Sequence, residues 1–235
     1  EVISSRFCAD LPTEIARRLD AMFTHRDADI ALHEPRFNTQ AEKLVLECVR
    51  STYVSSVGEY VNHFEENLAA ACGVKYAVAM VNGTAALEVA LKVVGVEPGS
   101  EVLLPSLTFV ATANAVSHLN AVPHFVDVED RSFGIDSHAL ERHLNKIGRQ
   151  TSGGLFNKET GRRISAIVPV HVFGHPAAME ELNAVASTFD LPVIEDAAEA
   201  LGSQYKQKHC GSLGHAAAFS FNGNKILTTG GGGMI

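Results

Sequence analysis

From residue 74 onward, short apolar runs alternate with amphipathic stretches, and this alternation restricts the fold more than any other feature. The apolar runs contain few polar positions, as expected of strands covered on both faces of a sheet. Strands separated by helices imply a mostly parallel sheet flanked by helices, so the sequence predicts an α/β domain. The predicted strands cover residues 77–81, 101–104, 122–126, 166–170, 192–195 and 216–221, and the predicted helices cover residues 84–94, 111–119, 137–147 and 177–189.

The chain before residue 74 has a different pattern. Residues 12–23, 40–53 and 59–72 carry apolar residues at helical spacing, which predicts three helices. We therefore expect a helical N-terminal arm and entry segment over residues 1–73 and a large domain over residues 74–235. Within that domain, Asp136 is a candidate N-cap, and residues 151–163 are expected to form an exposed loop or hairpin.

The end of the chain also carries an expectation. A run of glycines at residues 230–233 is followed by Met234 and Ile235, as if a strand were beginning. Domains seldom end in this way. We expect that the large domain is truncated here and that a second, C-terminal domain is absent from the chain.

Composition limits the partners. The chain is 46% hydrophobic and 20% charged, and no apolar run approaches the ~20 residues that a membrane span requires. The net charge is −8, and the only basic pairs are Arg17-Arg18 and Arg162-Arg163. A groove that follows a phosphate backbone needs a basic stripe, so neither a membrane nor a nucleic acid is the expected partner.

The cysteines lie far apart in the sequence. They form neither a CxxC motif nor a cluster with metal-ligand spacing, so we expect reduced thiols in a cytoplasmic protein and no metal site. They are Cys8, Cys48, Cys72 and Cys210.

Four segments follow predicted strands, where parallel sheets bind their ligands. In the first, residues 81–87, a strand turns at Gly83 and enters a helix beside Thr84. Free N–H groups at a helix start can bind an anion. A turn with a purely structural purpose fits these residues equally well.

The second and third segments carry an aromatic ring and a carboxylate. Phe109 follows the strand at residues 101–104, and it is either a core residue or a ligand contact at the edge of the sheet. Asp196 follows the strand at residues 192–195. It is either a helix N-cap or the partner of a cationic ring nitrogen, because an opposite charge favours the ionised carboxylate.

The fourth segment, residues 219–225, ends in Lys225 among small and polar residues. A lysine at such a place can act as a Schiff-base nucleophile. Taken alone, a solvated surface lysine remains the ordinary interpretation.

In combination and in this order, the four segments resemble the cofactor-binding pattern of fold-type-I pyridoxal 5'-phosphate (PLP) enzymes, specifically the DegT-type nucleotide-sugar aminotransferases. The resemblance extends from about His33 to the end of the chain. Residues 33–37, 54–58 and 170–174 are most similar to the LegC-like branch, which aminates UDP-linked 4-keto-6-deoxy amino sugars. The matching motifs are Asn82-Gly83-Thr84-Ala85-Ala86-Leu87, residues 105–114, Glu195-Asp196-Ala197-Ala198 and Ser220 with Lys225.

The resemblance implies a role for each matched position. Lys225 would hold the cofactor as a Schiff base and move protons between substrate and cofactor carbons. Asp196 would pair with the pyridine nitrogen, and Phe109 would stack on the ring. Glu199 occupies a position near the cofactor's hydroxyl group, where many members carry Gln or His. The phosphate would be held by Ser220 and the helix start formed by Gly83, Thr84 and Ala85.

Three further residues have open roles. Ser55 and Ser56 either contact the sugar or nucleotide or cap a loop. His171 is expected to be a hydrogen-bonded histidine at a strand end and not a catalytic residue.

The function implied by the resemblance is transfer of an amino group, with L-glutamate as donor, to a nucleotide-linked 4-keto-6-deoxy sugar for polysaccharide biosynthesis. Members form homodimers that share their active sites and use a small C-terminal domain, so the 235-residue chain alone is expected to be inactive. Two alternatives stay open: sugar dehydration, in which members replace the lysine by histidine, and a non-catalytic PLP-binding regulator.

Overall fold

The computed structural model describes residues 5–22 and 33–235. The chain divides into two compact units, residues 1–34 and residues 35–235. In the first unit, α1 (Ser5–Met22) begins before the predicted helix, and the predicted end at Phe23 lies outside the described residues. The Glu14 carboxylate of α1 accepts hydrogen bonds from Arg17 and Arg18, each at 2.8 Å.

The second unit begins with two of the predicted helices, α2 (Thr39–Ser51) and α3 (Glu59–Cys72). The side chain of Asn38 caps α2 by accepting from Ala41 N at 2.9 Å. Gly73 ends α3 in the left-handed conformation that glycine adopts without strain. Both helices belong to the same compact unit as the α/β part, residues 35–235. The expected boundary between an N-terminal arm and a large domain, at residues 73 and 74, stays a prediction.

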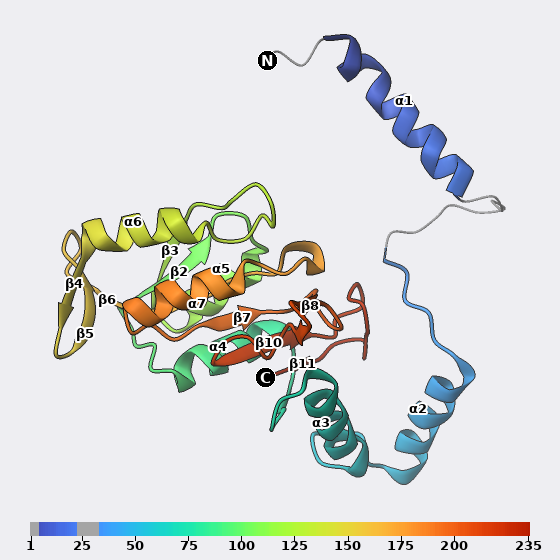
Figure 1. Cartoon of the computed structure of the whole chain (residues 1–235). Coiled ribbons are helices and arrows are strands. Elements are labelled where there is room, and N and C mark those ends of the chain that lie inside the picture. Colours follow the sequence, from blue (N-terminus) through green and yellow to red (C-terminus); the bar gives the residue numbers. More distant parts are fainter. Residues whose placement is uncertain (1–4, 23–32) are drawn as a thin grey trace. The chain divides into compact units, whose positions relative to one another are not determined.

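The strands of the α/β part form a mixed, mostly parallel sheet (Figure 1). β2 pairs with β3 and β6 in parallel, and β7 pairs with β10 in parallel. The short β11 lies between β1 and β10 and is antiparallel to both, so β1 and β10 run in the same direction. The strands are β1 (Ala79–Met80), β2 (Glu101–Pro105), β3 (Val122–Val126), β6 (Arg163–Ile167), β7 (Ile194–Asp196), β10 (Ala216–Ser220) and β11 (Gly233–Met234).

Hydrogen bonds beyond the named strands join β6 to β7. Ile167 N donates to Pro192 O at 2.9 Å, and Asp196 N donates to Pro169 O at 2.8 Å. The strands therefore lie in the order β1-β11-β10-β7-β6-β2-β3. Because all except β11 point the same way, their carboxyl ends meet at one edge of the sheet.

Short antiparallel pairs complete the strands. The segment expected to be a loop or hairpin is a hairpin, with β4 (Gly148–Thr151) paired to β5 (Gly154–Asn157) and β5 paired to the start of β6. A second small hairpin joins β8 (Gln204–Tyr205) to β9 (Lys208–His209).

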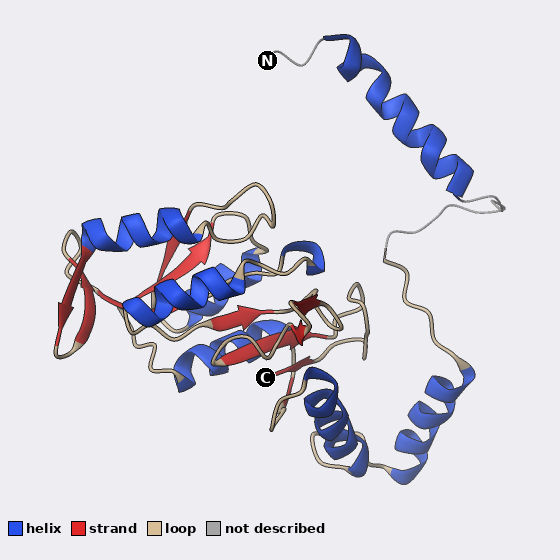
Figure 2. Ribbon diagram, in the orientation of Figure 1, coloured by secondary structure: helices blue, strands red, loops and turns tan. Residues whose placement is uncertain are grey.

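Helices cover both faces of the sheet, as predicted (Figure 2). In β2, Leu103 points to the face covered by α6 (Ser137–Ile147) and α7 (Met179–Thr188). Its neighbours Val102 and Leu104 point to the opposite face, covered by α4 (Gly83–Val93) and α5 (Val110–His118). All three side chains are fully buried, so period-2 alternation places apolar side chains in both layers.

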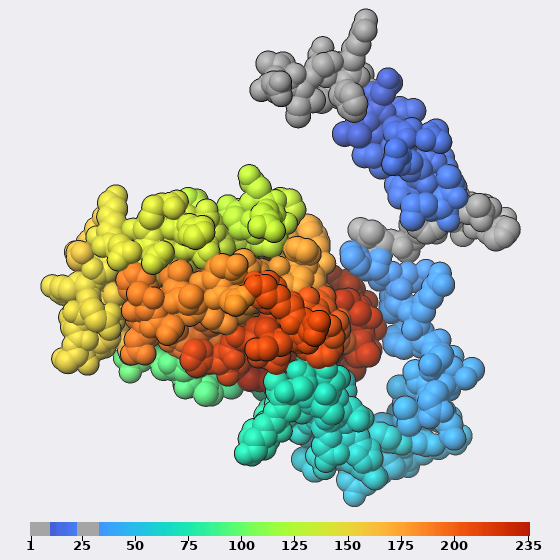
Figure 3. Space-filling model, viewed as in Figure 1, coloured from blue at the N-terminus to red at the C-terminus, as the bar shows by residue number. Residues whose placement is uncertain are grey.

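In the space-filling view, α6 and α7 form adjacent parts of the visible surface (Figure 3). Their buried apolar side chains pack in one cluster with Leu103 of β2. As predicted, Asp136 caps α6 by accepting from Ala139 N at 2.9 Å.

Within residues 5–22 and 33–235, no helix combines the length and the apolar character needed to cross a membrane.

Candidate active site

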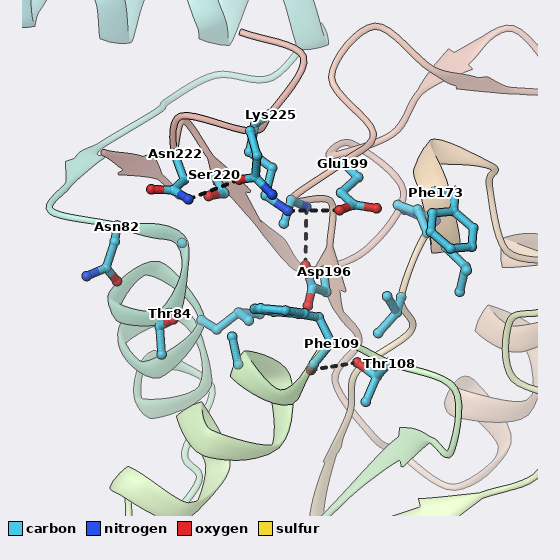
Figure 4. Close-up of a pocket in the computed structure, with 18 of the residues that line it drawn as sticks. Asn82, Thr84, Thr108, Phe109, Phe173, Asp196, Glu199, Ser220, Asn222 and Lys225 are labelled. Carbon is cyan, nitrogen blue, oxygen red and sulfur yellow. Dashed lines mark hydrogen bonds and ion pairs between the residues drawn. The ribbon is translucent and has the colours of Figure 1, made fainter. Parts of the chain in front are cut away.

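A cavity of about 510 Å³ lies at the carboxyl edge of the sheet (Figure 4). It is formed by the segments that follow β1, β2, β6, β7 and β10, which the parallel topology brings together. Most of the predicted site residues line it. These are Gly83, Thr84, Phe109, Asp196, Glu199, Ser220 and Lys225.

Lys225 reaches the cavity from the turn after β10. Its backbone N–H donates to Asn222 O at 3.0 Å, which fixes the turn. Its Nζ donates to Glu199 Oε1 at 2.9 Å and lies 5.8 Å from the centre of the Phe109 ring. The side chain of Lys225 is only 12% exposed, so the solvated surface lysine that the sequence allowed does not describe it.

Asp196 points into the cavity from the end of β7 and is 5% exposed. Its Oδ2 accepts from Thr112 Oγ1 at 2.7 Å, and its Oδ1 accepts from Ala198 N at 3.2 Å. Thr108 donates in turn to the Thr112 hydroxyl at 2.7 Å, so a chain of two hydroxyls orients the carboxylate.

The pKa of Asp196 indicates which kind of ligand group would suit the cavity. Burial raises the pKa of Asp196, and this outweighs the hydrogen bonds from Thr112 and Ala198 and the charge of Lys225, which lower it. A nearby cation favours the charged form of a buried carboxylate whose hydrogen bonds do not offset its burial. A protonated ring nitrogen in the cavity would supply that cation, so Asp196 fits the cofactor that the sequence implies.

The start of α4 forms one end of the cavity. Asn82 caps this helix, and its side chain accepts from Ala85 N at 2.8 Å. The Ala85 amide is thus engaged within the helix cap, and Ala85 is not among the lining residues.

A Cβ at Gly83 would come within 2.9 Å of Ser220 Cβ, so only glycine lets Ser220 approach the helix start. The first helical bond of α4 runs from Ala86 N to Asn82 O. The N–H groups of Gly83 and Thr84 therefore have no acceptor within the helix and are suited to an anion.

Phe109 lies directly before α5, with 69% of its surface exposed, and its ring lines the cavity. This exposure contradicts the alternative that Phe109 is a core residue. An exposed aromatic ring beside a lysine and a carboxylate is suited to stacking on a planar ligand.

Two of the predicted contacts lie elsewhere. Ser55 and Ser56 are exposed in the segment between α2 and α3 and do not line the cavity. Glu199 lines it, but its side chain is 41% exposed and is paired with Lys225.

His171 lines the cavity and is hydrogen-bonded at both ring nitrogens, as expected of a structural histidine. Its Nε2 bonds to Glu195 Oε2 at 2.9 Å, and its Nδ1 accepts from Ala177 N at 3.1 Å.

The sequence did not identify several other residues at or near the cavity. Thr112 does not line the cavity but supports Asp196 from behind it, and nothing in the sequence indicated this contact because the two residues are 84 positions apart. Phe173 is a second such residue. It is 89% exposed at the cavity and has a φ of 52°, which is unusual for a residue with a side chain. Asn222 and Asn224 also line the cavity and bond to each other at 3.0 Å.

The order of the strands and the residues at their carboxyl edge define the large domain of a fold-type-I PLP transferase. The model of the DegT/DnrJ/EryC1/StrS aminotransferase family matches residues 35–235. This chain belongs to that family.

Individual relatives agree with this placement. GDP-perosamine synthase of Caulobacter vibrioides is 44% identical over 88% of this chain and 51% of its own length. EpsN of Bacillus subtilis, provisionally named as a pyridoxal phosphate-dependent aminotransferase, is 41% identical over 88% of this chain and 50% of its own length. The chain therefore spans about half the length of these relatives.

A solved structure shows the same fold. The aminotransferase from Psychrobacter cryohalolentis superposes with a TM-score of 0.75 at 34% sequence identity, covering 86% of this chain and 47% of that one.

Proposed function

We propose that the cavity binds PLP and that the intact protein is a PLP-dependent nucleotide-sugar aminotransferase. The observation that carries this proposal is the convergence of Lys225, Asp196 and Phe109 on one cavity, with a helix start at its end. When bound, PLP supplies the electron sink that stabilises a carbanion at the carbon bearing the amino group.

The residues of this chain divide the remaining tasks. Lys225 would hold the cofactor through Nζ and, once freed, carry a proton on Nζ between the reacting carbons. Asp196 would keep the ring nitrogen protonated, and Thr112 would hold the Asp196 carboxylate in place. Glu199 Oε1 lies 2.9 Å from Lys225 Nζ and would keep this amine directed into the cavity.

The other end of the cavity would hold the phosphate. Gly83 and Thr84 would offer backbone amides and Ser220 a hydroxyl, with the positive end of the α4 dipole behind them. Phe109 would cover the ring and limit the access of water.

For the acceptor, we propose a nucleotide-linked 4-keto-6-deoxy sugar, with UDP as the nucleotide and L-glutamate as the amino donor. The support for UDP is the similarity of residues 33–37, 54–58 and 170–174 to the LegC-like branch. The name of the Caulobacter relative contains GDP, so a GDP-linked sugar is the acceptor to compare.

The product identifies the acceptor. The intact protein, loaded with PLP and incubated with glutamate and either the UDP-linked or the GDP-linked keto sugar, should yield an amino sugar detectable by mass spectrometry. Amination of the GDP-linked sugar alone would replace UDP in the proposal. Loss of water from the sugar without gain of nitrogen would favour dehydration, although Lys225 argues against that reaction.

The lysine can be identified directly. Borohydride reduction of the PLP-loaded protein should attach the cofactor covalently to Lys225, and peptide mapping should find the label there. Lys206 and Lys208 are internal controls in the same domain, and a label on either would contradict the assignment. Lys225→Ala should lose transamination while keeping the phosphate-binding residues.

The intact protein is further proposed to be a cytoplasmic homodimer with shared active sites. The described cysteines Cys48, Cys72 and Cys210 are free thiols, in keeping with a reducing compartment.

A PLP-binding regulator remains the second candidate, and it would bind the cofactor without a spectral change when glutamate is added.

A further inference from the structure

A second carboxylate of β7 is buried behind the cavity. Glu195 is 0% exposed and immediately precedes Asp196. Because neighbouring residues of a strand point to opposite faces, Asp196 enters the cavity and Glu195 points away from it. A fully buried carboxylate is costly unless its hydrogen bonds are satisfied, so its partners indicate why it is retained.

Three hydrogen-bond partners of Glu195 are backbone N–H groups of the loop that leads into β10. Its Oε1 accepts from Leu213 N and Gly214 N, each at 2.7 Å. Its Oε2 accepts from Gly211 N at 2.9 Å. A Cβ at Gly214 would lie 2.7 Å from Val193 O, so the loop can close on this carboxylate only with glycine there. Glu195 thereby ties β7 to the start of the strand that carries Ser220 and precedes Lys225.

The fourth partner is His171, which is 1% exposed. Because its Nδ1 accepts from Ala177 N, the ring hydrogen is on Nε2 and is donated to Glu195 Oε2 at 2.9 Å. The backbone N–H of His171 also donates to Asp196 O at 3.1 Å. One histidine thus contacts both acidic residues of β7, through its side chain and its main chain.

We propose that Glu195 and His171 form a buried positioning pair, which fixes Asp196 relative to the strand that carries Ser220 and to the turn that carries Lys225. β10 pairs with β7 with Ala217 opposite Glu195 and Ala218 opposite Asp196. A change in the loop at residues 211–214 would move that register and displace Asp196 from the cofactor's ring nitrogen. The inference rests on the proposed function for its catalytic consequence, but the bonds that carry it belong to the protein alone.

The test compares two buried glutamates. Glu195→Gln replaces one accepting oxygen by an amide that faces N–H donors. Glu101→Gln is the matched control, because Glu101 is 2% exposed, bonds to His124 Nδ1 at 2.8 Å, and lies at the first residue of β2, away from the cavity. Any cost common to a buried Glu–His pair appears in both variants.

Two readouts separate positioning from general stability. Without cofactor, hydrogen exchange at the amides of Gly211, Leu213 and Gly214 should accelerate in Glu195→Gln and not in Glu101→Gln. With PLP bound, the pH midpoint of the cofactor absorbance should shift only in Glu195→Gln, and kcat should fall about 100-fold, the cost of a misplacement of about 1 Å. Unchanged exchange, or an equal loss of activity in both variants, would overturn the inference.

Histidine variants keep the inference testable if Glu195→Gln does not fold. His171→Gln can place an amide donor where Nε2 lies, whereas His171→Asn can keep only the acceptor near Nδ1. We expect His171→Gln to retain the wild-type absorbance midpoint and His171→Asn to shift it. The reverse order would contradict the positioning role. A wild-type protein that binds no PLP would instead contradict the proposed function, and the exchange experiment would still decide whether Glu195 holds the loop.

Discussion

At the scale of residues, the buried carboxylate of Asp196 lowers the stability of the folded protein without cofactor. Its carboxylate is buried between Thr112 and Ala198, and burial raises its pKa above the ordinary value of 3.8. The folded protein without cofactor therefore keeps this proton to a higher pH than the unfolded chain does. The contribution of Asp196 to the free energy of unfolding is fully present below about pH 3.8 and is lost as the pH rises through the higher folded pKa.

Asp196→Asn should consequently stabilise the cofactor-free protein while removing its activity. An amide carries no charge to bury, so we expect unfolding at neutral pH to require about 1 kcal/mol more free energy, in the range found for relief of strained functional sites. Without a carboxylate to hold the ring nitrogen protonated, turnover should fall by several orders of magnitude. Urea denaturation and steady-state rates measure the two effects. Near-normal turnover in this variant would assign the ring nitrogen to another residue.

The sequence predicted the residues whose chemistry depends on their own position after a strand. Lys225, Asp196 and Phe109 follow predicted strands, and a parallel sheet brings such positions together. Thr112 and Glu195 could not be assigned their contacts in this way. Thr112 lies inside a helix, and Glu195 bonds to amides at residues 211–214, so both depend on pairings between distant segments.

At the scale of elements, periodicity predicted the longer helices and buried strands. Helices α3 and α6 and strand β3 have the predicted bounds. The strand expected at residues 166–170 is shifted, because β6 (Arg163–Ile167) begins by pairing with the β4–β5 hairpin. The antiparallel insertion of the two-residue β11 between β1 and β10 carries no periodic signal of its own.

One junction of elements should respond to pH. His124 of β3 bonds through Nδ1 to Glu101 of β2 at 2.8 Å and through Nε2 to His143 Nε2 of α6 at 2.9 Å. Burial lowers the pKa of His143, and the charge of His124 and that of Lys146 lower it further, while Glu159 and Asp127 oppose them. Folding therefore disfavours protonated His143. Its contribution to stability is present above the ordinary pKa of 6.5 and is lost as the pH falls through the lower folded value.

His143→Gln should remove this acid sensitivity. Glutamine does not titrate, and its side-chain amide can hydrogen-bond to His124 Nε2 as donor or as acceptor. The variant should therefore lose less free energy of unfolding than the wild type between about pH 7.5 and about pH 5.5. His138→Gln, at an exposed position of the same helix, is the control. Glu101 does not interfere, because hydrogen bonds from Asn157, Thr160 and His124 outweigh its burial and hold its pKa below 4.5. Equal losses in wild type and His143→Gln, measured by urea denaturation, would contradict the prediction.

At the scale of the whole molecule, residues 35–235 expose apolar side chains in a pattern that favours assembly. α2 buries none of its residues, and Val45 and Val49 on it are 65% and 60% exposed. Tyr53 and Val57, which follow the helix, are 66% and 74% exposed. A run of exposed apolar residues of this kind marks an interaction surface, and a second copy of the chain is the occupant that the proposed homodimer supplies.

Val49→Glu in the intact protein should therefore weaken the dimer, because a charge would be buried at the interface. Sedimentation or light scattering over a dilution series should show dissociation at higher concentrations than for the wild type. Val93→Glu is a matched control, because Val93 is 78% exposed at the last residue of α4. If the active sites are shared, the activity of Val49→Glu should fall in parallel with its dimer fraction and recover at high protein concentration. A monomeric wild type with full activity, or a monomeric Val49→Glu variant that keeps full activity, would contradict the shared site, because each subunit would then hold every group that the reaction needs.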